Sequence, residues 1–109
     1  MIGVRLYLAQ RLSAMIMAPL ILVHLVVMIY AIQDGIDAQE ILSRTRGSVW
    51  WAAMYGLLAA AVSVHAAIGL RSIVHEYLKI TALPLNILTW AIGLFLMGMG
   101  ANAVVAVTL

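Results

Sequence analysis

Three long stretches of the chain carry no charged residue, and they decide which folds are open to it. These stretches cover residues 12–33, 47–70 and 80–109. Each is longer than the roughly 20 residues that a helix needs to cross the ~30 Å hydrocarbon core of a bilayer. We therefore predict an all-α integral membrane protein, a single domain over residues 1–109 whose three transmembrane helices form one small bundle. The expected spans are about 8–31, 48–77 and 84–107.

The composition excludes several other classes of protein. Hydrophobic residues make up 66% of the chain and charged residues 9%, against roughly 25% charged residues in soluble domains. Six Lys and Arg residues are too few for a nucleic-acid-binding surface, so the expected surroundings are membrane lipid and other subunits. The lack of cysteine excludes disulfides, thiol catalysis and ligation of an iron–sulfur cluster by this chain.

The basic residues outside the spans predict how the chain crosses the membrane. Cytoplasmic loops are enriched in Lys and Arg. Four basic residues fall on one side of the expected bundle and two on the other: Arg5, Arg11, Arg71 and Lys79 against Arg44 and Arg46. The N-terminus is therefore expected in the cytoplasm and the C-terminus outside, in a multi-pass protein of the inner (cytoplasmic) membrane of a bacterium.

The loop over residues 33–46 and the start of the third span carry helix signals. Asp34 is the expected N-cap of a short surface helix in this loop. Its apolar residues are expected to face the bilayer, namely Ile36, Ile41 and Leu42. The third span is expected to begin at Pro84, because the missing N–H of proline costs nothing in the first turn of a helix.

His65 lies inside the second span, where an ionisable side chain is a functional candidate by default. Ala61 and Gly69 lie one turn to either side of it on the same helix face. Small residues beside an imidazole leave the flat space that a porphyrin with an axial histidine ligand requires. The alternative is that His65 hydrogen-bonds a neighbouring helix and that the small residues serve helix packing.

The two other histidines differ from His65 in depth. If Arg11 and Arg71 both mark the inner interface, His24 lies ~20 Å below it and His65 ~9 Å below it. The two rings are therefore not expected to share one iron, and a haem with two histidine ligands at His65 would need a ligand from a second chain. His24 is the weaker candidate ligand, and His75 at the wet inner end is expected to be an interfacial or quinone-site residue.

Two segments resemble a known family. Residues 65–71 (His-Ala-Ala-Ile-Gly-Leu-Arg), followed by Glu76 and Tyr77, resemble the second helix of the cytochrome b membrane-anchor subunits of succinate dehydrogenase and fumarate reductase. In that family a His-x-x-x-Gly pattern supplies an axial haem ligand, and a tyrosine at the inner helix end touches the quinone. Residues 10–13 (Gln-Arg-Leu-Ser) resemble the His-Arg-x-Ser motif of the larger anchor, whose arginine lies at the quinone pocket.

The resemblance implies roles for individual residues. It implies haem b ligated by His65, with Arg71 near a haem propionate. His24 resembles the first-helix histidine of the two-haem anchors, which makes it a candidate second ligand of haem iron. The implied quinone site lies at the inner interface and contains Arg11, Tyr77, Tyr7 and Ser13. This chain departs from the family pattern at Gln10, where a histidine is common, and at Tyr7, where a serine is often found.

The resemblance also implies what the chain does within a complex. Such an anchor docks a flavoprotein subunit with FAD and an iron–sulfur subunit, pairs with a second membrane-anchor subunit, and helps to pass electrons between succinate or fumarate and ubiquinone or menaquinone. It is not catalytic alone. Two alternatives are a structural or assembly subunit without a redox cofactor and a small transporter. For a transporter we would expect four spans and a membrane-embedded carboxylate.

Overall fold

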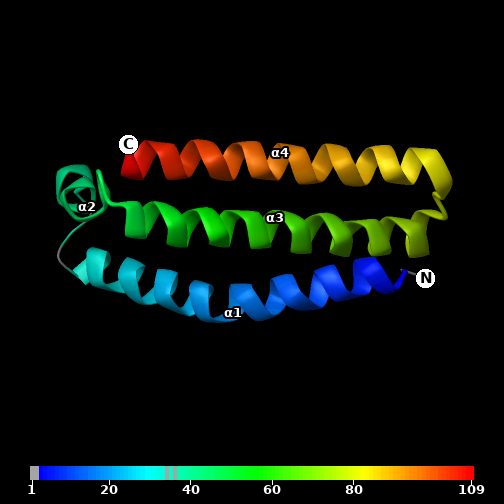
Figure 1. Ribbon diagram of the computed structural model, residues 1–109, viewed down its shortest axis with the longest axis horizontal. Helices are drawn as coiled ribbons and strands as arrows, with labels where there is room; N and C mark the ends of the chain where they lie inside the picture. The colour runs from blue at the N-terminus through cyan, green and yellow to red at the C-terminus, as the bar shows by residue number, and fades with distance from the viewer. Residues whose placement is uncertain (1–2, 34, 36) are drawn as a thin grey trace.

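The computed structural model describes residues 3–33, 35 and 37–109. In this part of the chain the structure is helical throughout, apart from short connections (Figure 1). The helices are α1 (Val4–Gln33), α2 (Ala38–Thr45), α3 (Val49–Leu78) and α4 (Ala82–Thr108). α1, α3 and α4 are long and apolar enough to cross a membrane, which confirms the prediction of an all-α protein with three transmembrane helices.

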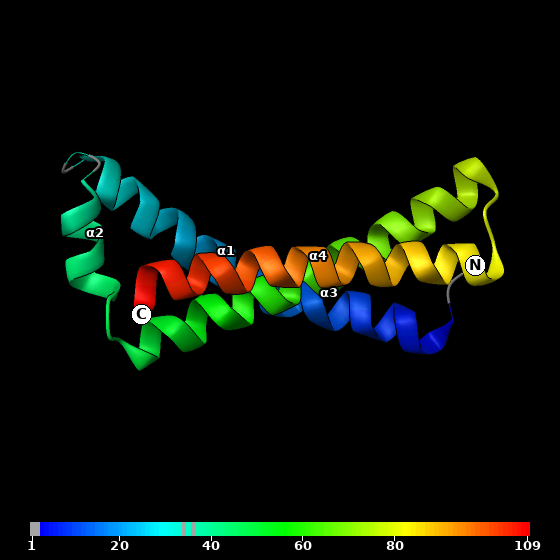
Figure 2. The same cartoon turned by 90° about the horizontal axis from the view of Figure 1, so that it is seen from above.

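The three long helices lie side by side with α3 in the middle (Figure 1). The start of α1 and the connection between α3 and α4 lie at one end of the bundle, and α2 and the C-terminus lie at the other. Seen from above, α1 and α3 cross and diverge toward both ends (Figure 2). The basic residues assigned to the two membrane sides therefore lie at opposite ends of the bundle.

The ends of the helices are set by local capping. The Ser48 side chain accepts a hydrogen bond from the Trp51 amide at 3.2 Å and starts α3. At its other end α3 stops at Lys79, whose left-handed φ of 59° turns the chain out of the helix. α4 begins at Ala82, two residues before the predicted Pro84. Pro84 is tolerated there because no amide of the first turn has an intrahelical acceptor.

The short helix α2 is capped by Asp37, and the predicted cap Asp34 lies outside the described residues. The Asp37 carboxylate accepts a hydrogen bond from the Gln39 amide at 3.1 Å. α2 is fastened to the end of α4, since the Thr45 hydroxyl donates to the Val107 carbonyl at 2.6 Å and the Gly47 amide donates to the Thr108 carbonyl at 2.7 Å.

The apolar residues of α2 are partly covered in this position. The side chains of Ile41 and Leu42 are half-buried, and Ile41 lines a cavity of the bundle. The expectation that Ile41 faces the bilayer is therefore corrected, because α2 packs on α4. For Leu42 it stays a prediction. Ile36, the third residue of that prediction, lies outside the described residues.

α3 and α4 approach each other closely through small residues. A Cβ atom at Gly100 would lie only 2.8 Å from the Cβ of Ala59, and one at Gly93 would lie 3.5 Å from that of Ala67. Most large apolar side chains remain exposed on the described part of the chain. This combination is typical of membrane helices, which associate through small residues and present large apolar ones to lipid.

Candidate functional site

His65 on α3 faces α1, and one of its ring nitrogens is already engaged there. Its Nδ1 atom lies 3.2 Å from the backbone carbonyl oxygen of Gln10. A carbonyl only accepts, so Nδ1 carries a proton, and in the neutral imidazole the lone pair is then on Nε2. Metal-ligating histidines are typically fixed in this way, with one nitrogen donating to a carbonyl and the other binding the metal. The ring is half-buried.

The same Gln10 carbonyl also receives a hydrogen bond from the Ser13 hydroxyl, at 2.8 Å. Ser13 is 6% exposed, so it is held inside the contact between α1 and α3. Its hydroxyl hydrogen is used within the chain. The structure thus brings Gln10, Ser13 and His65 together, although Ser13 was predicted as a quinone-site residue and Gln10 was noted only as a departure from the family motif.

The small residues around His65 serve helix packing. Ala61 is 6% exposed. A Cβ at Gly69 would lie 3.5 Å from the Gln10 Nε2 atom, so this side of the helix is occupied by the Gln10 side chain. The expectation of open flat space at these two residues is therefore corrected for this chain: the room beside Gly69 is used by α1.

Arg11 and Tyr7 form an exposed polar pair on α1. The Arg11 Nη1 atom donates to the Tyr7 hydroxyl oxygen at 3.5 Å, one helical turn away. Tyr7 is 50% exposed. Because Arg11 follows Gln10 directly, this pair lies near the level of His65 along the bundle.

Tyr77 lies far from the pair formed by Arg11 and Tyr7. Gln10 is level with His65 and Gly69, and Tyr77 lies eight to twelve residues farther along α3, which is about 12–18 Å of helix. The divergence of α1 and α3 toward this end (Figure 2) keeps the two helices apart there. Tyr77 is 78% exposed, and the expectation that it shares a level with Arg11 is corrected by this register.

Arg71 joins α3 to α4. Its Nη1 atom donates to Asn86 Oδ1 at 2.7 Å and to Thr89 Oγ1 at 3.2 Å. Arg71 follows His65 by six residues, which places it about 120° around the helix from that ring. The guanidinium predicted to meet a haem propionate therefore points to α4 in this structure. Nearby, the His75 Nδ1 atom lies 3.1 Å from the Ile80 carbonyl oxygen at the end of α3.

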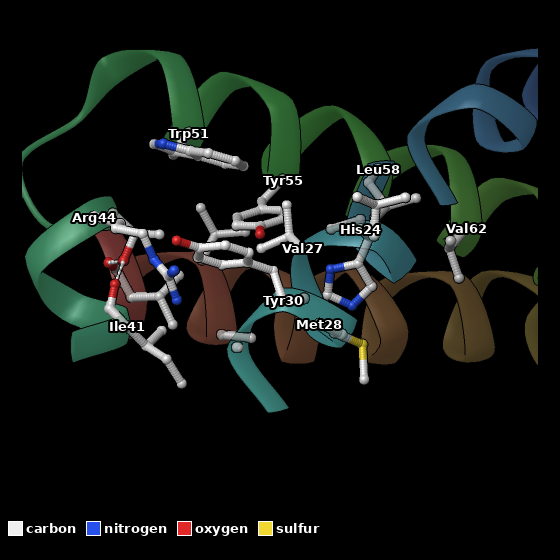
Figure 3. Close-up of a pocket in the computed structure, with 18 of the residues that line it drawn as sticks. His24, Val27, Met28, Tyr30, Ile41, Arg44, Trp51, Tyr55, Leu58 and Val62 are labelled. Carbon is white, nitrogen blue, oxygen red and sulfur yellow. Dashed lines mark hydrogen bonds between the residues drawn. The ribbon is translucent and has the colours of Figure 1, made fainter. Parts of the chain in front are cut away.

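His24 lies in the other half of the bundle and lines a cavity there (Figure 3). The cavity holds about 680 Å³. The His24 ring meets the Tyr55 ring edge-on, with ring centres 5.6 Å apart. Its Nδ1 atom is buried and has no hydrogen-bond partner among the described residues. Other lining residues are mostly apolar, among them Val27, Leu58, Val62 and Gly100.

A cation and three aromatic rings line the end of this cavity that lies next to α2. The Arg44 guanidinium on α2 lies 5.1 Å from the centre of the Tyr30 ring, and the Trp51 and Tyr55 rings are 5.4 Å apart. Figure 3 shows Arg44 beside Tyr30. No sequence motif marks this group, and its one signal in the sequence is the presence of aromatic residues near both ends of the loop that contains α2.

The register separates His24 from His65. Gln10, level with His65, precedes His24 by fourteen residues, and Tyr55, beside His24, precedes His65 by ten. These intervals correspond to about 21 and 15 Å of helix. Two imidazoles on one iron lie only about 4 Å apart, so the two rings cannot ligate the same iron.

Three apolar spans, with one imidazole at a helix contact and another on an interhelical cavity, define a small helical multi-pass membrane protein. The family model for the succinate dehydrogenase/fumarate reductase transmembrane subunit matches residues 1–107. The chain belongs to this family. Comparison with curated proteins and with solved structures gave no match. Membership implies association with the catalytic subunits of such a complex and leaves the transporter alternative without support.

Proposed function

We propose that the chain is the membrane anchor of a succinate:quinone oxidoreductase, with haem b at His65 and quinone bound near Arg11. The observation that carries this proposal is the contact between His65 Nδ1 and the Gln10 carbonyl at 3.2 Å. It selects the tautomer that a haem ligand needs and turns the ring toward a fixed direction. In addition, docking of flavoprotein and iron–sulfur subunits follows from the function of the family.

The residues present fit a haem at His65 in the chemistry of the donor. A neutral imidazole whose Nδ1–H is engaged offers the lone pair of Nε2 to a metal, and His65 as a residue is only half-buried. A bound haem would supply one-electron storage within the membrane. His24 is too distant to serve as the second axial ligand, so that ligand comes from another chain, for which the second membrane-anchor subunit is the natural source.

The proposed quinone head site is built on Arg11 and Tyr7. The Tyr7 oxygen accepts a hydrogen bond from Arg11, which leaves the hydroxyl hydrogen of Tyr7 available to donate to a quinone carbonyl. The Arg11 guanidinium supplies positive potential where negative charge develops on the quinone oxygens. Ser13 holds the backbone of this helix segment. Tyr77 lies about 12–18 Å of helix beyond this level and is not part of the proposed head site.

A second haem b site at His24 is the alternative that one further observation favours. The 680 Å³ cavity beside His24 has the size and apolar lining of a small-molecule site. The unpartnered, buried Nδ1 atom is a costly arrangement for a protein interior. Arg44 at the rim would balance anionic propionate groups. The chain would then carry one haem ligand in each half of the membrane.

The distribution of the basic residues supports one orientation of the bundle in the membrane. The cytoplasmic end of the bundle would contain the start of α1 and the connection between α3 and α4, in the inner membrane of a bacterium. The docked subunits and the quinone site lie on that side. The His24 cavity and α2 lie at the outer side.

Optical spectroscopy of the complex purified with its partner subunits tests these assignments. We expect His65→Ala to remove a low-spin b-type spectrum and the control His75→Ala to keep it. His24→Ala should remove a second spectral component if the outer cavity holds haem. Wild-type complex with intact subunits but no haem spectrum would favour a purely structural anchor. A full spectrum in His65→Ala would refute the assignment of that ligand.

A further inference from the structure

Ser13 and His65 share one acceptor, although they lie on different helices. The Ser13 hydroxyl donates to the Gln10 carbonyl at 2.8 Å and His65 Nδ1 donates to the same oxygen at 3.2 Å. In a continuous α-helix this carbonyl also accepts from the peptide amide four residues later. Three donors therefore converge on an oxygen with two lone pairs.

The lengths of the two bonds agree with competition for that oxygen. The His65 bond is at the long end of the usual 2.7–3.2 Å range for N–H···O bonds, whereas the Ser13 bond is close to the usual length for a hydroxyl donor. Ser13 is almost fully buried, so water does not replace its bond easily. The serine thus holds part of the accepting capacity that would otherwise serve His65.

We propose that Ser13 is a positioning residue that weakens the hydrogen bond from His65 Nδ1 to the Gln10 carbonyl and so raises the reduction potential of the haem at His65. This inference rests on the haem ligation proposed above. A stronger bond from the Nδ1–H makes an imidazole a more basic ligand. A more basic ligand stabilises oxidised over reduced iron, and hydrogen bonding around the ligand is one of the levers by which proteins set haem potentials.

The direction of the effect follows from this chain of contacts. Removing the Ser13 hydroxyl leaves the Gln10 carbonyl to His65, strengthens that bond and lowers the potential. In the native chain the serine keeps the haem easier to reduce. This role differs from direct quinone contact, for which the buried hydroxyl of Ser13 is badly placed.

The test is a potentiometric titration of the haem in the purified complex, comparing wild type with Ser13→Ala. We expect the equilibrium constant for haem reduction to fall about threefold to tenfold, which is a shift of about 28 to 59 mV to lower potential for one electron. Ser13→Thr keeps the hydroxyl and should restore the wild-type potential. The matched control is Ser72→Ala, which removes a similar bond from serine to the Ile68 carbonyl on α3 and should leave the potential unchanged.

The outcomes separate this inference from the haem assignment. An unchanged or raised potential in Ser13→Ala at full haem content would overturn the role of Ser13. The same shift in Ser72→Ala would also overturn it, because the effect would then be general loosening. A complex that keeps its haem in His65→Ala would overturn the proposed function instead. If Ser13→Ala fails to assemble, Ser13→Cys, with a weaker donor, should show a smaller shift in the same direction.

Discussion

The contact between Gly100 and Ala59 makes a quantitative prediction for the packing of α3 against α4. A Cβ atom at position 100 would lie 2.8 Å from the Ala59 Cβ, whereas carbon atoms in contact prefer about 3.5–4.0 Å. Gly100→Ala therefore requires the two helices to separate by roughly 0.7–1.2 Å at this level. A gap of about that size removes a quarter to a half of the attractive van der Waals energy of each neighbouring contact.

Gly98→Ala is the matched control for Gly100→Ala. A Cβ at Gly98 meets no heavy atom within 4 Å, and both glycines lie within the same helix. Each substitution gains about 1 kcal/mol of helix propensity, so this gain cancels in the comparison. Since overpacking typically costs about 1–3 kcal/mol, we expect Gly100→Ala to be less stable than Gly98→Ala by that amount.

The measurement is the free energy of unfolding in mixed micelles, from titration with a denaturing detergent followed by circular dichroism. Helicity before unfolding should be the same in both variants, because the strain acts between helices and not within one. Equal unfolding free energies for Gly98→Ala and Gly100→Ala would refute the close approach of α3 and α4 at this level.

Three other predictions concern the ends of the bundle. A single cysteine at position 79 should react with a membrane-impermeant reagent only from the cytoplasmic side, because four basic residues lie at that end and two at the other; labelling from outside would reverse the topology. Tyr7→Phe should slow quinone reduction about ten- to a hundredfold at unchanged succinate oxidation with a soluble acceptor, since one lost hydrogen bond costs about 1–3 kcal/mol. Tyr30→Phe, at the end of the bundle next to α2, should leave quinone reduction unchanged. Thr45→Val removes the hydrogen bond to the Val107 carbonyl, which should lower the free energy of local unfolding of α2 by about 0.5–1.5 kcal/mol. Amide hydrogen exchange should therefore become faster in α2 but not in α3.

The helices could be predicted from the sequence because lipid imposes a simple rule. A charge-free run of sufficient length must be a helix, since its backbone groups have no partner in hydrocarbon other than one another. Helix ends were less predictable. Asp34 and Asp37 are both good capping residues, and only the attachment of α2 to α4 through Thr45 shows where that helix lies.

The level of each site residue along the bundle, and the helix that its side chain faces, could not be predicted in the same way. Arg11 and Arg71 were expected to mark one membrane level, but the register of α1 against α3 is set by the contact between Gln10 and His65. That contact shifts Arg11 well away from Tyr77. The direction of Arg71 was also open, because its polar partners are on α4 and no local pattern specifies them.

The axial separation of His24 and His65 has an electrical consequence. The two imidazoles are about 15–21 Å apart along the bundle, which is roughly half to two thirds of a 30 Å hydrocarbon core. Moving one elementary charge across the whole membrane costs about 2.3 kcal/mol for each 100 mV, so transfer between these two levels would cost about 1.2 to 1.5 kcal/mol for each 100 mV. A redox route that uses both levels would therefore respond to the membrane voltage, whereas one confined to the level of His65 and Arg11 would be almost indifferent to it.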